Sequence, residues 1–294
     1  MSGHSTQNIA SQFSANQRRT GAFIYALHLA DNALISGQRN SEWCGHGPVL
    51  EQDIAITNIS LDLLGQARNF YQYAAGLYND FDKEEKKAVD HLIPRQWKTY
   101  DRELTEDDLA FLREERQYLN LLIAELPKGD WAFTVLRQFL FSAYQQLLYA
   151  ALQKSSDAQL AAIAEKSIKE VAYHLRWSSE WIIRLGDGTR ESGGRLIAAL
   201  KEIWTYTEEM FVPASFEQAA VEGGLSVDVY RLREEWFLKI TDVLTEATIP
   251  TEIIQQSKPG TMQQGGKEGR HTEHMGYLLA EMQYMQRTYP NSNW

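Results

Sequence analysis

A single cysteine, Cys44, occurs among the 294 residues, so the chain cannot form an internal disulfide. Basic residues are also outnumbered, because 29 Lys and Arg face 39 Asp and Glu. The resulting formal charge of −10 disfavours a general nucleic-acid-binding protein. No apolar run approaches the roughly 18 residues of a membrane-spanning helix, and the amino-terminus lacks the apolar core of an export signal. We therefore expect a cytoplasmic protein that binds neither nucleic acid nor membrane.

Glycine and proline are sparse, with 19 and 7 residues, whereas 44% of the chain is apolar. The apolar residues recur at helical rather than alternating spacing, which predicts an all-α fold. No composition change divides the chain into two domains. We expect a polar, flexible tail over residues 1–20, and one helical domain over residues 21–294 that carries a charged surface insertion at about residues 82–105.

Long helical periodicities predict four helices that span a bundle; they cover residues 21–38, 48–78, 131–153 and 158–186. The second of these has apolar residues on several sides, so we expect it to be a central, covered helix. Ser155, Ser156 and Asp157 offer capping oxygens for the fourth helix, and Gly186 could end it in a left-handed conformation. Shorter helices are expected at residues 107–127, 192–211, 226–248 and 271–289. Together they predict an antiparallel four-helix bundle with additional helices.

Such bundles often hold two iron ions, which need a carboxylate from each of two helices and a Glu-x-x-His pair from each of the other two. Asp31 and Asp62 lie on the first two predicted helices, but no acid of the second is followed by His at the third position. Residues 131–153 contain no Asp, Glu or His. Glu170 and His174 share one helix face, yet they are four residues apart instead of three. We therefore expect no metal in this chain and interpret these positions as vestigial, with Glu170 and His174 forming a buried hydrogen-bonded pair.

Two other groups could carry chemistry. Cys44 and His46 could act as nucleophile and base, but a glycine-flanked turn rarely holds them together, and no third group orients them. The sequence HTEH places four polar residues at a helix start, where Thr272 is a plausible cap and a metal would lack other ligands; the residues are His271, Thr272, Glu273 and His274. We favour the structural interpretation of both groups.

Four separated stretches resemble the PaaC-type subunits of bacterial phenylacetyl-CoA ring epoxidases. They are SEWCGHGPVLEQDIAITNISLDLLGQARNF, LREERQYLNLLIAELPKGDWAFTVLRQFL, KSIKEVAYHLRWS and GRHTEHMGYLLAEMQYMQR. The resemblance covers most of residues 21–294 in the same order. It implies a ferritin-like fold that has lost its metals, and a non-catalytic structural subunit that stabilises a related di-iron subunit.

The resemblance also implies the rest of a complex. The related subunit would activate O2 and epoxidise the ring of phenylacetyl-CoA, with electrons from NADPH passing through a reductase subunit that carries FAD and a [2Fe–2S] cluster. Small subunits would complete the assembly. The row Trp177, Trp181 and Leu185 is expected in the core or at a contact between subunits. Candidate contact residues, which we expect to be exposed, are the aromatics Trp181, Trp204 and Tyr206, and candidate CoA ligands are Arg68 and Arg176.

Two alternatives stay open at this point. The chain could be an independent di-iron oxygenase that uses Asp31, Asp62, Glu170 and His174 at unusual spacing. It could also be a regulatory scaffold unrelated to phenylacetate. Metal content separates the first from a structural subunit, and binding to the di-iron subunit separates the second.

Overall fold

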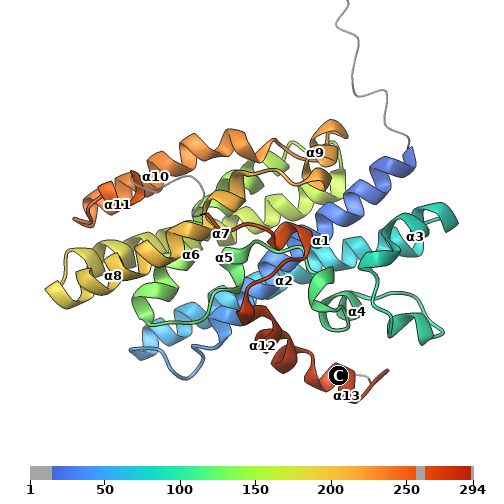
Figure 1. The fold of residues 1–294 in the computed structure, drawn as a ribbon, viewed down its shortest axis with the longest axis horizontal. Helices are drawn as coiled ribbons and strands as arrows, with labels where there is room; N and C mark the ends of the chain where they lie inside the picture. The colour runs from blue at the N-terminus through green and yellow to red at the C-terminus, as the bar shows by residue number, and fades with distance from the viewer. Residues whose placement is uncertain (1–14, 256–261, 293–294) are drawn as a thin grey trace, which may run out of the picture.

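The computed structural model describes residues 15–255 and 262–292. Every regular element within these ranges is helical. Four long helices form the bundle; they are α1 (Ala15–Ser41), α2 (Leu50–Asn79), α6 (Trp131–Leu152) and α7 (Ala158–Gly186). Short connections make α1–α2 and α6–α7 two antiparallel hairpins, and α2 also packs against α7 (Figure 1). The prediction of an all-α, ferritin-like bundle is confirmed.

Shorter helices surround this bundle (Figure 1). They are α3 (Lys83–Val89), α4 (Glu106–Phe111), α5 (Leu122–Glu125), α8 (Arg190–Ile203), α9 (Ser215–Glu222), α10 (Arg233–Glu246), α11 (Glu252–Gln255), α12 (Glu273–Met282) and α13 (Tyr284–Thr288). The expected charged insertion contains α3, which Asp82 and Glu85 cap reciprocally. The insertion also contributes to the core, because the side chains of Val89, Leu92 and Ile93 are buried.

The first helix begins six residues earlier than the sequence indicated. Arg18 donates to the Ser156 hydroxyl (2.7 Å), and Arg19 donates to Glu85 (3.1 Å). These contacts hold residues 15–20 in the helix, so the expectation of a flexible tail over this stretch is wrong. The rest of that expectation, residues 1–14, lies outside the described residues.

The central helix of the bundle is α6 rather than α2. Of the 22 residues of α6, 18 are buried, and Asp130 caps its start by accepting from the Phe133 N–H (2.9 Å). By contrast, α2 exposes Leu50, Ile54 and Leu61 to solvent. The described chain covers α2 on several sides, by α1, α4 and α7, as expected, but α2 is not the central helix because it leaves one side of its first half open.

Residues 107–127 do not form the single helix that their periodicity predicted. Only α4 and α5 are α-helical there, and residues 118–121 have no regular secondary structure. Side chains of α1 explain the difference, because Asp31 accepts the Leu119 N–H (2.7 Å) and Asn32 accepts the Leu121 N–H (2.8 Å). These bonds replace the intrahelical bonds that a helix would have offered to the same donors.

Three other predicted helices are shorter than expected. The 192–211 stretch contains α8 followed by two 3₁₀ helices, Trp204–Tyr206 and Glu208–Phe211. The 226–248 stretch contains the 3₁₀ helix Val229–Leu232 and α10, and Gln283 separates α12 from α13. The prediction of a cap at Asp157 is confirmed, because its carboxylate accepts from Gln159 N (3.0 Å) and Leu160 N (2.9 Å).

Gly186 serves close packing rather than a left-handed turn, since its φ is not positive. A Cβ atom at this position would overlap the carbonyl oxygen of Ala247. We expect Gly186→Ala to lower the free energy of unfolding by about 2 kcal/mol, because the end of α10 must move away. Gly194→Ala is the matched control, since a Cβ there meets nothing within 4 Å. Urea denaturation should find the control neutral or up to about 1 kcal/mol more stable, and equal effects at both sites would refute the packing argument.

Candidate functional site

Asp31 lies in the bundle interior with a cation of the chain itself as its partner. Its carboxylate and the guanidinium of Arg113 are both fully buried and form an ion pair, in which Nη1 is 3.1 Å from Oδ2. The Tyr71 hydroxyl donates to the same carboxylate at 2.5 Å, and the guanidinium lies 4.2 Å from the ring centroid of Tyr118. Burial lowers the pKa of Arg113, but the charge and hydrogen bond of Asp31, together with Tyr71 and Tyr118, outweigh burial and raise the pKa. Arg113 therefore stays charged and occupies the place where a cation would approach Asp31.

The other three predicted positions meet at the contact between α2 and α7. His174 Nε2 lies 2.9 Å from Asp62 Oδ2, and Gln66 Nε2 donates to Glu170 Oε2 at 2.9 Å. The expectation of a hydrogen bond between Glu170 and His174 is therefore wrong, because each side chain reaches across to α2. Glu170 and His174, which are four residues apart on α7, contact Gln66 and Asp62, which are four residues apart on α2. These contacts join the two helices.

The buried side of α6 offers amides, hydroxyls and the cation Arg137, but no acid or histidine. Asn40 donates to Gln138 Oε1 (2.6 Å), Gln138 donates to the Ser142 hydroxyl (2.7 Å), and Gln145 donates to the Tyr149 hydroxyl (3.4 Å). Among the described residues, no three His, Cys, Asp or Glu side chains are arranged to hold a metal ion. A di-iron centre requires about six such ligands converging from four helices. The residues present do not fit that group, and no catalytic step through iron follows from them.

Neither of the other sequence candidates forms a reactive group. The ring of His46 contacts the backbone oxygen of Cys44 (3.0 Å) rather than its thiol. Asp53 shapes this exposed loop by accepting from Gly47 N (2.8 Å) and Gly45 N (3.1 Å), and these bonds lower the pKa of Asp53. At the start of α12, the Thr272 hydroxyl accepts the His274 N–H (3.3 Å), so the predicted cap is confirmed.

His271 forms a buried ion pair that the sequence did not reveal. Its Nδ1 lies 3.2 Å from Glu125 Oε2 and its Nε2 lies 3.1 Å from the Tyr118 carbonyl oxygen, with both side chains fully buried. Both neighbours are acceptors, so both ring nitrogens carry protons. Burial lowers the pKa of His271, but Glu125 outweighs it and raises the pKa. The pair ties α12 to α5, and it leaves neither nitrogen free for a metal.

Two further buried acids also have partners within the chain. Lys267 donates to Glu217 (2.7 Å), although both side chains are almost completely buried. Glu209 accepts three backbone N–H groups, from Leu122, Gly265 and Gly266, at 2.7–2.8 Å. The glycines of the sequence QQGGKEG are typical of a loop, but they do not indicate that Glu209 binds this loop. Together with Asp31 and Glu125, these contacts use interior acids to fasten segments together.

Of the aromatic residues predicted at contacts between subunits, some are buried and the others are half-buried. Trp177 is buried and Trp181 half-buried, and both indoles donate to Gln52 Oε1, at 3.1 and 2.7 Å. Trp204 is buried against Trp236, at 5.7 Å between ring centroids. The expectation that Trp204 is exposed is therefore wrong, because α10 covers it. Tyr206 is half-buried, so none of the predicted aromatics is fully accessible.

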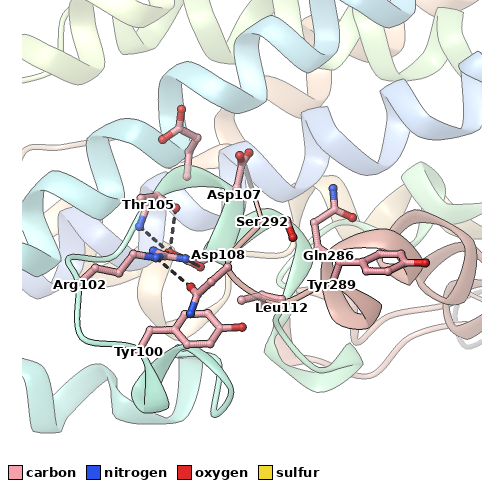
Figure 2. A pocket seen from close by; sticks show the side chains of 11 residues that line it. Tyr100, Arg102, Thr105, Asp107, Asp108, Leu112, Gln286, Tyr289 and Ser292 are labelled. Carbon is pink, nitrogen blue, oxygen red and sulfur yellow. Dashed lines mark hydrogen bonds and ion pairs between the residues drawn. The ribbon is translucent and has the colours of Figure 1, made fainter. Parts of the chain in front are cut away.

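Neither candidate CoA ligand lies in an evident phosphate-binding site. Arg68 pairs with Glu106 (3.3 Å), and the Arg176 guanidinium lies 5.7 Å from the ring of Tyr173. A cavity of about 310 Å³ lies nearby, between the α4 region and the carboxyl-terminal segment (Figure 2). Its arginine, Arg102, is bound at 2.6 and 2.8 Å to Asp108, and its other charged lining residues are acids. This negative lining disfavours the phosphates of CoA.

Comparison with known proteins gives two matches. The sequence model of the family described as phenylacetic acid catabolic protein matches residues 7–294. A 1,2-phenylacetyl-CoA epoxidase subunit of Escherichia coli (strain K12), the one designated C, is 44% identical over 270 residues, which cover 92% of this chain and 98% of that protein. No helix among the described residues is long and apolar enough to cross a membrane. On the length and identity of these matches, the chain belongs to the phenylacetic acid catabolic protein family.

Proposed function

We propose that this chain is the non-catalytic subunit of a phenylacetyl-CoA epoxidase, where it stabilises the related di-iron subunit. The buried Asp31–Arg113 pair carries the proposal, because the Arg113 guanidinium occupies the place beside Asp31 that a bound metal ion would take. The relative from Escherichia coli, itself named as one subunit of such an epoxidase, supports membership of a multi-subunit enzyme in phenylacetate catabolism. The absence of Asp, Glu and His from α6 is in accord with the same role.

The proposed division of labour leaves the chemistry to the other subunits. The di-iron centre belongs to the related subunit, and a reductase subunit with FAD and a [2Fe–2S] cluster delivers electrons from NADPH. Phenylacetyl-CoA reaches this chain only through the complex, which small subunits complete. The acidic lining of the cavity beside Arg102 supports this view, because it repels an anionic thioester.

An independent di-iron oxygenase is the alternative that one observation favours, since Asp62 contacts His174 between α2 and α7 and Glu170 lies one turn earlier on α7. Iron analysis of the purified chain tests it directly. We expect negligible iron in the chain alone and iron in its complex with the related subunit. About two iron ions bound per isolated chain, together with oxygenase activity, would contradict the proposed function.

The variant Glu170→Ala distinguishes packing from metal binding at this contact. We expect it to leave iron content and the activity of the complex unchanged. It should lower the free energy of unfolding by about 1–2 kcal/mol, because the buried Gln66 amide loses its acceptor. Thermal unfolding and metal analysis measure the two effects. Glu165→Ala, at an exposed position of the same helix, is the control and should change neither. A loss of iron from the complex in Glu170→Ala alone would favour the oxygenase.

A further inference from the structure

The outer side of α2 carries an exposed apolar stripe in its first half. Leu50, Ile54 and Leu61 have relative exposures of 72%, 52% and 60%. Their spacing of four and seven residues places them on one side of the helix. Val49 precedes them and is 52% exposed. These are large aliphatic side chains on a long bundle helix, with no described element covering them.

In the second half of α2, the same side of the helix is polar. Arg68 and Gln72 continue the stripe at the same spacing, and both donate to Glu106 of α4, at 3.3 and 2.9 Å. The outer side of α2 is therefore polar where the chain covers it with α4 (Figure 1) and apolar where the described chain leaves it open. This reversal indicates that another molecule covers the apolar half.

The neighbouring surface of α7 extends the apolar area. Tyr173 is 36% exposed and precedes His174, whose ring contacts Asp62, the residue after Leu61. The guanidinium of Arg176 lies 5.7 Å from the Tyr173 ring. Tyrosine and arginine are both enriched at protein interfaces. We call the five side chains Val49, Leu50, Ile54, Leu61 and Tyr173 the α2 patch.

The α2 patch fits contact with another molecule. Its five side chains are between 36% and 72% exposed, and several large apolar side chains exposed together on one surface mark a site of contact with a protein or a membrane. A lipid surface fits less well, because interfacial helices carry Lys and Arg beside their apolar face, whereas Glu51 and Asp53 lie beside this one. A second copy of the chain is also disfavoured, because each copy carries a formal charge of −10.

We propose that the α2 patch is the surface on which the related di-iron subunit docks. This inference rests on the proposed function and adds the place of contact. An apolar helix face of the partner would pack over Leu50, Ile54 and Leu61, with Tyr173 at the edge of the contact. The partner would then cover the half of the outer side of α2 that α4 leaves open.

Matched double variants test the contact in the full-length chain. The test variant is Leu50→Ser/Leu61→Ser, which changes side chains with 72% and 60% exposure. The control is Tyr230→Ser/Leu238→Ser, whose side chains have 65% and 58% exposure and belong to the segment that leads into α10 and to α10 itself. That segment lies on the other side of the bundle from the first half of α2 (Figure 1). We expect the test variant to raise the Kd for the related di-iron subunit at least about 30-fold, and the control to change it less than about threefold.

Each result has a separate meaning. Absence of binding by the unchanged chain would overturn the proposed function itself. Unchanged binding by the test variant would overturn only the docking surface. A wild-type homodimer that the test variant alone abolishes would also overturn it, because a second copy would then be the occupant.

Hydrogen–deuterium exchange of the unchanged chain provides a readout that does not depend on how the variants fold. In the complex, we expect slower exchange in residues 50–65 and 170–177 than in the free chain, with residues 229–246 unaffected. Protection confined to other segments would contradict the proposed surface.

Discussion

Replacing Arg113 by methionine is expected to destabilise the protein by about 3–5 kcal/mol, because it leaves the Asp31 carboxylate charged and buried without its cation. The guanidinium also donates to the Tyr71 hydroxyl (3.0 Å) and to the carbonyl oxygens of Leu109 (2.6 Å) and Gln117 (2.7 Å), so the variant also loses a second bond to the bundle and two bonds that shape the segment after α4. Denaturant unfolding measured by circular dichroism gives the free energy. The double variant Asp31→Asn/Arg113→Met should recover part of the loss, since it removes the unpaired charge.

Arg68→Met is the matched control for this change. Arg68 also pairs with a carboxylate, that of Glu106, but its side chain is 69% exposed. Its removal should alter stability by less than about 0.5 kcal/mol, because solvent screens exposed ion pairs. If Arg113→Met cost no more than the control, the Asp31–Arg113 pair would not be the buried anchor that we describe. The position would then remain open to a metal, and the argument for a non-catalytic subunit would lose its main support.

The long helices were predictable because local signals and packing agree there. The 158–186 stretch has both helical periodicity and a capping aspartate, and the structure forms α7 over the same residues. The stretch 107–127 has the same periodicity without forming one helix. Its backbone donors bind Asp31 and Asn32, which lie almost ninety residues earlier in the chain. No property of the local sequence carries that information.

The contacts of the candidate site residues also could not be predicted from the local sequence. Helical spacing correctly placed Glu170 and His174 on one side of α7, but it could not show that each pairs across the contact with α2. Asp31 was found as an acid on the first helix, whereas its partner Arg113 lies in the stretch whose fold was mispredicted. Likewise, Trp204 looked available for a contact between subunits because only the tertiary structure places Trp236 against it.

Stability is expected to fall as the pH rises through the pKa of His271 in the folded protein. That pKa is raised, because Glu125 outweighs the effect of burial, so the imidazolium contributes its full stabilisation below about pH 6.5, the pKa of unfolded histidine. The neighbouring charges include Glu115, which acts in the same direction as Glu125, and Arg39, whose Nε donates to the Glu125 carbonyl oxygen (3.0 Å). Each unit by which the pKa is raised adds about 1.4 kcal/mol to stability at low pH, and this contribution disappears at high pH.

Glu125→Gln isolates this contribution. At pH 6 the variant should be about 3–5 kcal/mol less stable than the unchanged chain, because it buries the His271 imidazolium without its carboxylate or forces it to lose a proton. The difference should shrink as the pH rises, since His271 becomes neutral in both proteins. His46→Gln is the control, because His46 is exposed and its ring contacts a backbone oxygen of its own loop. Unfolding curves between pH 6 and pH 9 measure both variants. A stability difference that stayed constant over this range would mean that His271 is not the proton-binding group, and that Glu125 supports α12 only through its hydrogen bond from the Thr272 N–H (2.8 Å).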